Sequence, residues 1–186
     1  MKIVLASASQ FRKRALDMLG VPYEICPSRI DEKAIRDNDP ASLTRKLAEE
    51  KARKVASEHP DAVVVSGDAV VSKAGRIYEQ PRNLAEAAQF LRELSEFQFV
   101  TALAVMHSQT RRMLSTVEVS DISFRPLAEG EIQSYIEKYC VLNYAGAFES
   151  DAVLFFADRI CGSYNFVAAL PVSRLIVFLR AQGIKI

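Results

Sequence analysis

The sequence predicts a mixed α/β fold, a mixed β-sheet flanked by helices, on two observations. First, short apolar runs rich in valine and isoleucine, typical of buried strands, recur along the chain. Second, longer stretches between them place apolar residues every three or four positions, which is typical of amphipathic helices. The chain has 186 residues, 49% hydrophobic and 25% charged, which suits one globular domain, and we expect that domain to span residues 1–186.

The first third of the chain predicts two strands, each followed by a helix. The strands are expected at residues 2–6 and 23–26. A Ser7-Ala8-Ser9 turn precedes the first helix, whose apolar positions share one face and which Gly20 ends. Asp39-Pro40 begins the second helix, because aspartate caps the first turn and proline fits the first helical position. This second helix runs to about Glu58.

The rest of the chain predicts further strands and helices in alternation. Residues 62–66 and 69–72 are expected to form two short strands, because Gly67-Asp68 places a flexible residue and a carboxylate between them. Asn83, with Glu86 three residues later, resembles a capping box that begins a helix. The remaining elements are expected to be this helix at 84–94, a hairpin of strands at 97–106 and 113–124, a helix at 128–139, strands at 153–156 and 165–169, and a closing helix at 172–182.

The overall charge and the cysteines narrow the class of protein. Lysine and arginine total 24, aspartate and glutamate total 23, and the net charge is +1. A nucleic-acid polymer is therefore not an expected partner, because its binding usually requires a basic surplus. No apolar run reaches the roughly 18 residues needed to span a membrane, so no membrane partner is expected either. Three distant cysteines, Cys26, Cys140 and Cys161, favour a reducing compartment, and we expect a cytoplasmic protein.

The near-zero net charge is a sum of two local patches of opposite sign. Residues 1–16 carry four basic residues and no acidic one, and residues 144–158 carry three acidic residues and no basic one. A balanced total with opposed patches argues against a polymeric anion as ligand. It is compatible with a small ligand that is itself highly charged.

The segment from Ser7 to Arg14 is the first candidate site. It places the hydroxyls of Ser7 and Ser9 between a strand and a helix N-terminus, and three cations follow, beginning with Arg12. Cations there are repelled by the positive end of the helix dipole, and a bound anion would reverse that effect. Free N–H groups, hydroxyls and guanidinium groups together would form a phosphate site. The alternative is a serine cap followed by solvated basic residues.

Lys51 and Asp68 are the second and third candidates. Lys51 lies on the apolar stripe of its helix, so its ammonium either reaches solvent along that stripe or meets a charge. Asp68 stands within a run of valines, where a carboxylate is costly unless it is paired, solvated or bound to metal. Acids that converge with Asp68, among them Glu32 and Glu79, would suit a hard divalent cation. A simple turn at Gly67-Asp68 is the alternative.

Seven short motifs lie in order and in register over about residues 3–180. They are Leu5-Ala6-Ser7-Ala8-Ser9-Gln10-Phe11-Arg12, Asp31-Glu32, Glu50-Lys51-Ala52, Ser66-Gly67-Asp68, Glu79-Gln80-Pro81-Arg82, Ala145-Gly146-Ala147-Phe148 and Leu170-Pro171. Together they resemble the Maf (septum-formation inhibitor-like) family. The resemblance implies an elongated mixed sheet with two lobes around a cleft, as in inosine-triphosphate pyrophosphatases. It also implies a homodimer that hydrolyses a nucleoside triphosphate to the monophosphate and pyrophosphate with a divalent metal, magnesium or manganese.

The resemblance further implies a role for each candidate residue. The phosphates would be held by Ser7, Ser9, Arg12 and Lys51. Glu32 and Asp68 would bind the metal. Asp68 would also be the base that activates the attacking water. Lys51 would be a second catalytic residue. Such a hydrolysis needs positioning, neutralised charge and an oriented water, and these residue types provide all three.

Three positions depart from the family pattern. The first of two adjacent arginines is Phe11, the lysine before a proline is Gln80, and a glycine is replaced by Ala169. Gln80 removes a cation expected near the phosphates, and the candidate substitutes are Lys73, Arg76 and Arg82. An alternative function follows from Gln80, namely a nucleotide-binding regulator of cell division with weak or no catalysis.

By the same resemblance, Phe11, Ala69 and Asp151 hold the three positions that set substrate choice. The subgroup acting on thymidine and uridine triphosphates has arginine, threonine and glutamine there, and the subgroup acting on 7-methyl-GTP has an aromatic residue, glutamine and glutamate. Phe11 and Asp151 are nearer the second, because a ring stacks on a cationic purine and a carboxylate accepts hydrogen bonds from a guanine edge. Ala69 fits neither subgroup. The alternative is that Asp151 is a solvated loop residue.

Overall fold

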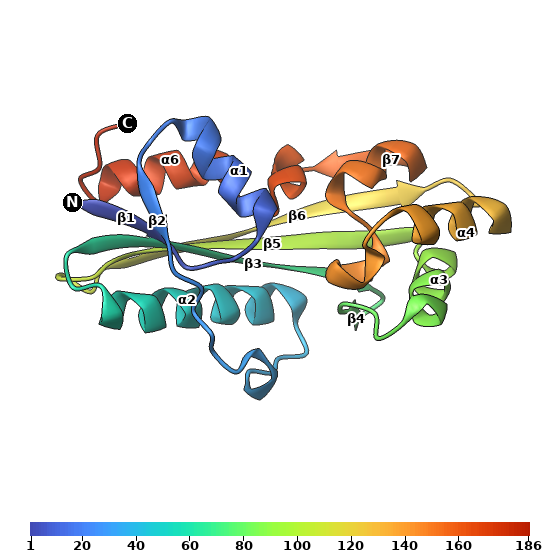
Figure 1. The fold of residues 1–186 in the computed structure, drawn as a ribbon, viewed down its shortest axis with the longest axis horizontal. Helices are drawn as coiled ribbons and strands as arrows, with labels where there is room; N and C mark the ends of the chain where they lie inside the picture. Colours follow the sequence, from blue (N-terminus) through green and yellow to red (C-terminus); the bar gives the residue numbers. More distant parts are fainter.

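The computed structural model forms a seven-stranded mixed sheet with helices on both faces, which confirms the predicted fold class (Figure 1). The strands are β1 (Lys2–Leu5), β2 (Tyr23–Ile25), β3 (Ala62–Lys73), β4 (Arg76–Tyr78), β5 (Glu96–His107), β6 (Met113–Phe124) and β7 (Ala157–Gly162). Their order is β2-β1-β3-β5-β6-β7, with β4 paired to β3 off this path. β1 runs parallel to β2 and β3, and the other pairings are antiparallel. Side chains are described for residues 1–151 and 153–186.

The helices cover both faces of this sheet. They are α1 (Gln10–Leu19), α2 (Pro40–Glu58), α3 (Leu84–Glu93), α4 (Glu129–Lys138), α5 (Val153–Phe156) and α6 (Val172–Ala181), with short 3-10 turns η1 (Glu32–Ala34), η2 (Val141–Asn143), η3 (Ala145–Ala147), η4 (Ser150–Ala152) and η5 (Tyr164–Ala168). Figure 1 shows α2 along one face of the sheet and α1 with α6 along the other. Helices α3 and α4 lie toward the end of the sheet that is farther from the two chain termini. Within the described residues, none of the helices is long and apolar enough to cross a membrane.

Successive side chains of β3 point to opposite faces of the sheet, which explains why both faces are covered. Val63 and Val65 pack in one apolar cluster with residues of α1 and α6, whereas Val64, between them, packs in a second cluster with α2. A third cluster, rich in phenylalanine, joins α3 and α4 to the far end of the sheet. A strand buried on both faces reads as a continuous apolar run, which is the pattern of residues 62–65.

Gly67 and Asp68 do not interrupt this strand, so the prediction of two short strands is wrong. β3 is continuous from Ala62 to Lys73. Gly67 allows a close approach: a Cβ there would lie 2.6 Å from Leu170 Cδ1 and 2.8 Å from the Ala102 carbonyl oxygen. Asp68 is tolerated inside the strand because its carboxylate is ion-paired with α2. The predicted turn is therefore a close contact followed by a paired charge.

One edge of β3 is unpaired over its middle. β1 pairs with β3 only as far as Leu5 and Val65, and β4 begins to pair at Val71. Between these points, the described strands place β5 on one side of residues 66–70 and no strand on the other. We call residues 66–70 the open edge. It lies beside the carboxyl end of β1, where sheets with parallel strands commonly bind their ligands.

The structure differs from the predictions toward the C-terminus. Residues 153–156 and 165–169, predicted as strands, fall in the helical segments α5 and η5, because a short apolar run does not distinguish a strand from a helical turn. The strand in this region is β7, whose residues are mostly exposed at the sheet edge, so it has no apolar alternation to read. β4, with three residues, is also not predicted. The other predicted helices and strands agree with the structure to within one residue at each end.

Candidate active site

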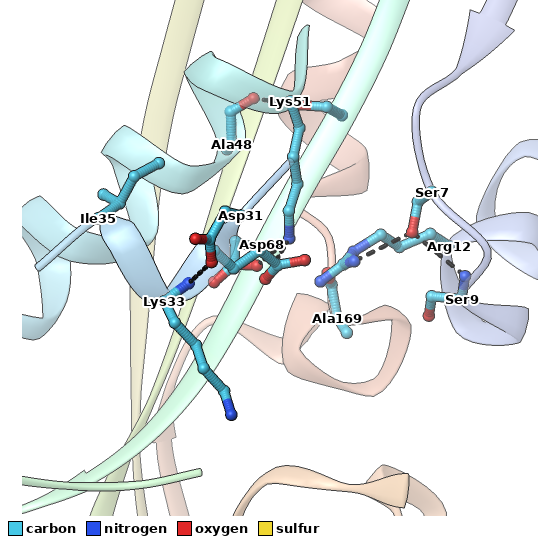
Figure 2. A network of polar contacts seen from close by, with 12 residues as sticks. Ser7, Ser9, Arg12, Asp31, Lys33, Ile35, Ala48, Lys51, Asp68 and Ala169 are labelled. Carbon is cyan, nitrogen blue, oxygen red and sulfur yellow. Dashed lines mark hydrogen bonds and ion pairs between the residues drawn. The ribbon is translucent and has the colours of Figure 1, made fainter. Parts of the chain in front are cut away.

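Lys51 is the centre of an ionic cluster of three residues: it contacts Asp68 (Figure 2) and also Glu32. Lys51 Nζ lies 2.6 Å from Asp68 Oδ1 and 2.9 Å from Glu32 Oε2. The side chains of Lys51 and Asp68 are 8% and 9% exposed, whereas that of Glu32 is 53% exposed. The sequence leaves two alternatives for Lys51, and in the structure its ammonium meets charge rather than solvent.

Separate local features bring the three groups together. The Ser66 hydroxyl donates to the Ala48 carbonyl oxygen, which fixes α2 against β3 and sets the buried ammonium opposite the strand. Glu32 begins η1, and the preceding Asp31 stabilises that turn by accepting the Lys33 N–H at 3.1 Å. The loop before α2 thus carries Glu32 to the cluster, while the carboxylate of Asp31 remains on its own turn.

Burial gives Asp68 unusual acid–base behaviour. Loss of solvent raises the pKa of Asp68; Lys51 and Arg12 oppose this rise by favouring the charged carboxylate, and the neighbouring Glu32 adds to it. A carboxyl group with a raised pKa takes up a proton more readily than an exposed aspartate does. This is the property that a general base requires near neutral pH.

Arg12, in the first turn of α1, faces the ionic cluster from the side of β1 (Figure 2). Its Nη1 donates to Ser7 Oγ at 3.1 Å and its Nε to the Ala169 carbonyl oxygen at 3.2 Å. Burial lowers the pKa of Arg12, and the carboxylates of the cluster oppose this shift, so the guanidinium stays charged at neutral pH. Among the described residues its Nη2 has no hydrogen-bond partner, which leaves this group available to an anion.

Ser9 begins α1 without capping it. Ser9 occupies the N-cap position, yet in the described part of the chain its hydroxyl makes no capping hydrogen bond, and its N–H donates to Ser7 Oγ at 3.2 Å. The serine-cap alternative is therefore wrong for Ser9. Hydroxyls, the free N–H groups of a first helical turn and the Arg12 guanidinium gather at one place, a combination that suits phosphate oxygens.

Ala169 holds the backbone turn that positions Arg12. Its φ of 47° and ψ of 33° are left-handed, a conformation that costs a residue with a Cβ about 1–2 kcal/mol. Glycine, the family's residue at this position, adopts it without that strain. The replacement by Ala169 therefore keeps the shape of the turn and the carbonyl oxygen that accepts from Arg12.

A second cluster joins two of the three positions at which the family resemblance implies substrate choice. The rings of Phe11 and Tyr144 meet edge to face with centroids 5.9 Å apart, and the Arg14 guanidinium lies 5.8 Å from the Phe11 centroid. Arg14 Nη1 also lies 3.7 Å from Asp151 Oδ2. Asp151 is thus exposed but ion-paired, and the pair links the basic and acidic patches of the sequence.

Ala69, the third of these positions, lies on β3 next to Asp68 and is half-buried. Tyr144 is not predicted from sequence, since a lone tyrosine in a loop carries no signal.

Among the described residues, neither Gln80 nor its candidate substitutes form a hydrogen bond or ion pair with the ionic cluster. Gln80 Nε2 donates to the Asn143 carbonyl oxygen at 3.0 Å. The three candidate cations are all engaged with α3 or the residues beside it: Arg76 with Glu93, Arg82 with Glu86, and Lys73 with the Glu93 carbonyl oxygen and the Ser95 hydroxyl. None of the three contacts the ionic cluster in the described structure, so the structure gives no support to their substitution for the family's lysine.

The carboxylates of the ionic cluster fit a divalent cation that is shared with substrate. The described residues contain no group of three or more histidine, cysteine or acidic side chains that could hold a metal on their own. Glu32 and Asp68 each contact Lys51 through one oxygen, which leaves the second oxygen of each carboxylate for a cation. Mg²⁺ is commonly bound by one or two carboxylates together with substrate phosphates. The carboxylates of Glu32 and Asp68 provide the protein's part of such a ligand set.

Two surface hollows lie elsewhere on the molecule. One, of about 490 Å³, is lined by residues of β5, β6 and β7, and the other, of about 330 Å³, lies where Met1 and Lys185 approach one another. Neither is lined by a residue of the ionic cluster. The candidate site is therefore identified by its chemistry and its place at the open edge.

Comparison with known proteins agrees with the motifs. The family model for Maf-like proteins matches residues 2–182. A relative named dTTP/UTP pyrophosphatase from Bacillus velezensis is 36% identical over 189 residues, which cover 99% of this chain and 98% of the relative. One of the same name from Deinococcus radiodurans is 35% identical, with 99% and 94% covered. A solved HAM1 protein from Coxiella burnetii superposes with a TM-score of 0.49 at 18% identity, covering 68% of this chain and 74% of that one. The chain therefore belongs to the Maf-like protein family.

Proposed function

We propose that the protein hydrolyses a nucleoside triphosphate to the nucleoside monophosphate and pyrophosphate with the help of a divalent metal. The observation that carries this proposal is the pairing of buried Lys51 with Asp68 and Glu32, opposite Arg12 and Ser7. Cationic donors and acidic oxygen ligands on two sides of one strand edge are what a triphosphate and its metal require. The names of the dTTP/UTP pyrophosphatase relatives support the same reaction.

In the proposed reaction, water attacks the α-phosphorus and the bond from this phosphorus to the bridging oxygen breaks. Arg12, with the Ser7 and Ser9 hydroxyls, holds phosphate oxygens, and Lys51 neutralises charge as pyrophosphate leaves. Asp68 takes the proton of the attacking water. A cation bound by Glu32 and Asp68 would supply further charge neutralisation for the phosphates. These residues supply position and charge, which is most of what phosphoryl transfer asks of a protein.

The base of the substrate is proposed on two separate grounds. Relatives at 35% and 36% identity bear the name dTTP/UTP pyrophosphatase, which favours thymine and uracil. The edge-to-face pair of Phe11 and Tyr144, with the Asp151 carboxylate nearby, favours 7-methyl-GTP as a second candidate, because a ring attracts a cationic purine and a carboxylate accepts from a guanine edge.

A panel of triphosphates tests the proposed reaction. The panel consists of dTTP, 7-methyl-GTP and the four common ribonucleoside triphosphates, UTP among them. Each is incubated with protein and magnesium or manganese, and pyrophosphate release is measured. We expect pyrophosphate, and no free phosphate, from dTTP and UTP or from 7-methyl-GTP. Folded protein that binds these nucleotides by calorimetry without turnover would support the alternative, a nucleotide-binding regulator.

Asp151→Gln tests the part of Asp151 in base choice. Because the amide can donate as well as accept, we expect the ratio of kcat/KM for dTTP to that for 7-methyl-GTP to rise about tenfold, the size of one hydrogen bond to a charged group. Arg14→Gln is the matched variant, since it removes the partner of Asp151 and keeps the carboxylate. An unchanged ratio in the Asp151 variant would assign this residue to the solvated surface.

Gln80→Lys tests whether a cation is missing from the site. Since Lys73, Arg76 and Arg82 are engaged with α3, we expect the restored lysine to raise kcat/KM at least about tenfold through one charge-assisted hydrogen bond to phosphate. Gln89→Lys, on an exposed position of α3, controls for added charge alone. A rate that does not change would mean that Arg12 and Lys51 already neutralise the phosphates.

A further inference from the structure

The geometry points to the open edge of β3 as the surface that reads the nucleobase, with the Gly67 carbonyl oxygen accepting a hydrogen bond from the base and the Ala69 N–H donating one to it. The class of base is one with an N–H beside a carbonyl on the same side of the ring, as in thymine, uracil and guanine. This inference rests on the proposed function, because it assumes that the ligand is a nucleotide.

The direction of the backbone groups follows from the pairing on each side of β3. The N–H and C=O of one strand residue point to the same side, and the side alternates along the strand. The Val65 carbonyl accepts the Ala6 N–H at 2.8 Å on the β1 side, and Val71 pairs with β4 on that same side. The Ala62 carbonyl accepts the Ser108 N–H at 2.9 Å on the β5 side. Odd-numbered residues therefore face the open edge, and Gly67 and Ala69 are the odd ones within it.

These groups lack partners in the folded chain. Within the described residues no hydrogen bond reaches the N–H or C=O of Gly67 or Ala69 from the open side. Gly67 is buried and Ala69 half-buried. Buried backbone groups are nearly always paired, so two unpaired residues in the middle of a strand indicate a place that a ligand or ordered water completes.

Neighbouring elements place this edge beside the aromatic pair. A Cβ on Gly67 would lie 3.2 Å from Arg12 Nε, so α1 lies over that end of the open edge. A Cβ on Gly146 would lie 3.1 Å from Val71 Cγ2, so η3 lies over the other end. Phe11 precedes Arg12 and Tyr144 precedes η3, and their rings meet edge to face with centroids 5.9 Å apart, so this aromatic pair joins the two segments that approach β3 at Gly67 and at Val71.

The chemistry of the edge favours a base over a phosphate. The carbonyl oxygen of Gly67 would repel a phosphate oxygen, whereas it accepts the ring N–H of a base. The Ala69 N–H, two residues on, matches the carbonyl next to that ring N–H. Asp68 lies between the two, so the strand that holds the base also holds the proposed catalytic carboxylate.

Amide NMR of the ¹⁵N-labelled full chain tests this assignment. The probes are the stable products dTMP and 7-methyl-GMP, their ring-N-methylated forms (at N3 and N1), and pyrophosphate alone. We expect dTMP or 7-methyl-GMP to shift the Ala69 amide and to slow its hydrogen exchange at least tenfold. Pyrophosphate alone should do neither, and ring methylation should weaken binding at least tenfold, since it removes the proton that Gly67 accepts.

Two outcomes would overturn the inference while the proposed function stands. In one, pyrophosphate release proceeds but no monophosphate affects the Ala69 amide. In the other, pyrophosphate alone protects it, which would assign the open edge to phosphate. Protection by a monophosphate in a protein without turnover would instead contradict the proposed function and keep this inference.

A pair of variants gives an independent measure. Ala69→Pro removes the N–H at an edge position, where proline is tolerated, and Ala69→Gly changes the side chain but keeps the N–H. We expect the KM of the proline variant to be at least tenfold above that of the glycine variant, with kcat changed less. Equal KM values in two folded variants would contradict the donor role, and if the proline variant does not fold, the NMR experiment still decides.

Discussion

Asp68→Asn is expected to lower the rate of pyrophosphate release by about 10²–10⁴-fold, the range of a lost general base. The amide is nearly the same size, but it does not accept the proton of the attacking water and is a poor metal ligand. The measurement is kcat under saturating nucleotide and metal. Asp121→Asn is the matched control, since Asp121 is an exposed carboxylate on β6 paired with Gln98. A fully active Asp68 variant would remove this residue from its catalytic role.

The same variant is expected to lose less stability at neutral pH than a variant that lacks Lys51, because the Lys51 ammonium keeps Glu32 as a charged partner and the buried Asp68 carboxyl is itself costly to ionise. Burial raises the pKa of Asp68 above the usual 3.8, so the folded state holds the proton more tightly than the unfolded chain does. The stability contributed by this carboxyl is therefore present at low pH and falls as pH rises from 3.8 through the raised pKa. Asparagine stays neutral and has no such loss. A marked fall in Tm at pH 7 would mean that the ion pair with Lys51 outweighs the cost of burial.

Lys51→Met is expected to damage both stability and activity. Removing one partner of a buried ion pair typically costs about 3–5 kcal/mol, because the other charge is left buried. Lys51 also holds the pKa of Asp68 down, so its loss raises that pKa further. We therefore expect the acid limb of the kcat/KM profile to move to higher pH, with kcat/KM at pH 7 about 100-fold lower. Urea denaturation and the pH profile measure the two effects.

Lys54→Met is the control for this substitution. Lys54 lies on the same helix and pairs with Glu58 at 2.7 Å, but both side chains are about half exposed. An exposed pair of this kind contributes at most about 1 kcal/mol, so the control should be nearly as stable as the natural protein. If the acid limb of the kcat/KM profile does not move in the Lys51 variant, the group that titrates in this profile is not Asp68.

Local patterns in the sequence predict the elements whose apolar residues face one side. Leu43, Leu47 and Val55 mark α2 correctly, because a long helix with a capped start has both a periodicity and a boundary signal. The run Val153 to Phe156 has neither, and it is helical where a strand is predicted. β7 is fixed by pairing with β6 and not by its own residues, so no local pattern reveals it.

The candidate site is predictable in its residue types but not in its convergence. Lys51 and Asp68 are recognisable because each places a charge on an apolar surface. That their charges meet depends on the packing of α2 on β3, which no spacing in the sequence gives. The contacts Arg14–Asp151 and Phe11–Tyr144 join segments more than 130 residues apart, and only the fold reveals them.

The parallel pairing of β1 with β3 has a consequence for folding kinetics. Ser7 and Arg12 come to Asp68 only when Leu5 lies beside Val65, about sixty positions later in the chain. Such non-local pairings form slowly, whereas the hairpin of β5 and β6 joins neighbouring segments. During refolding, the circular-dichroism signal of helices and of this hairpin should therefore return before enzymatic turnover does. The rate at which activity recovers would then report how fast β1 pairs with β3 and closes the long loop between them.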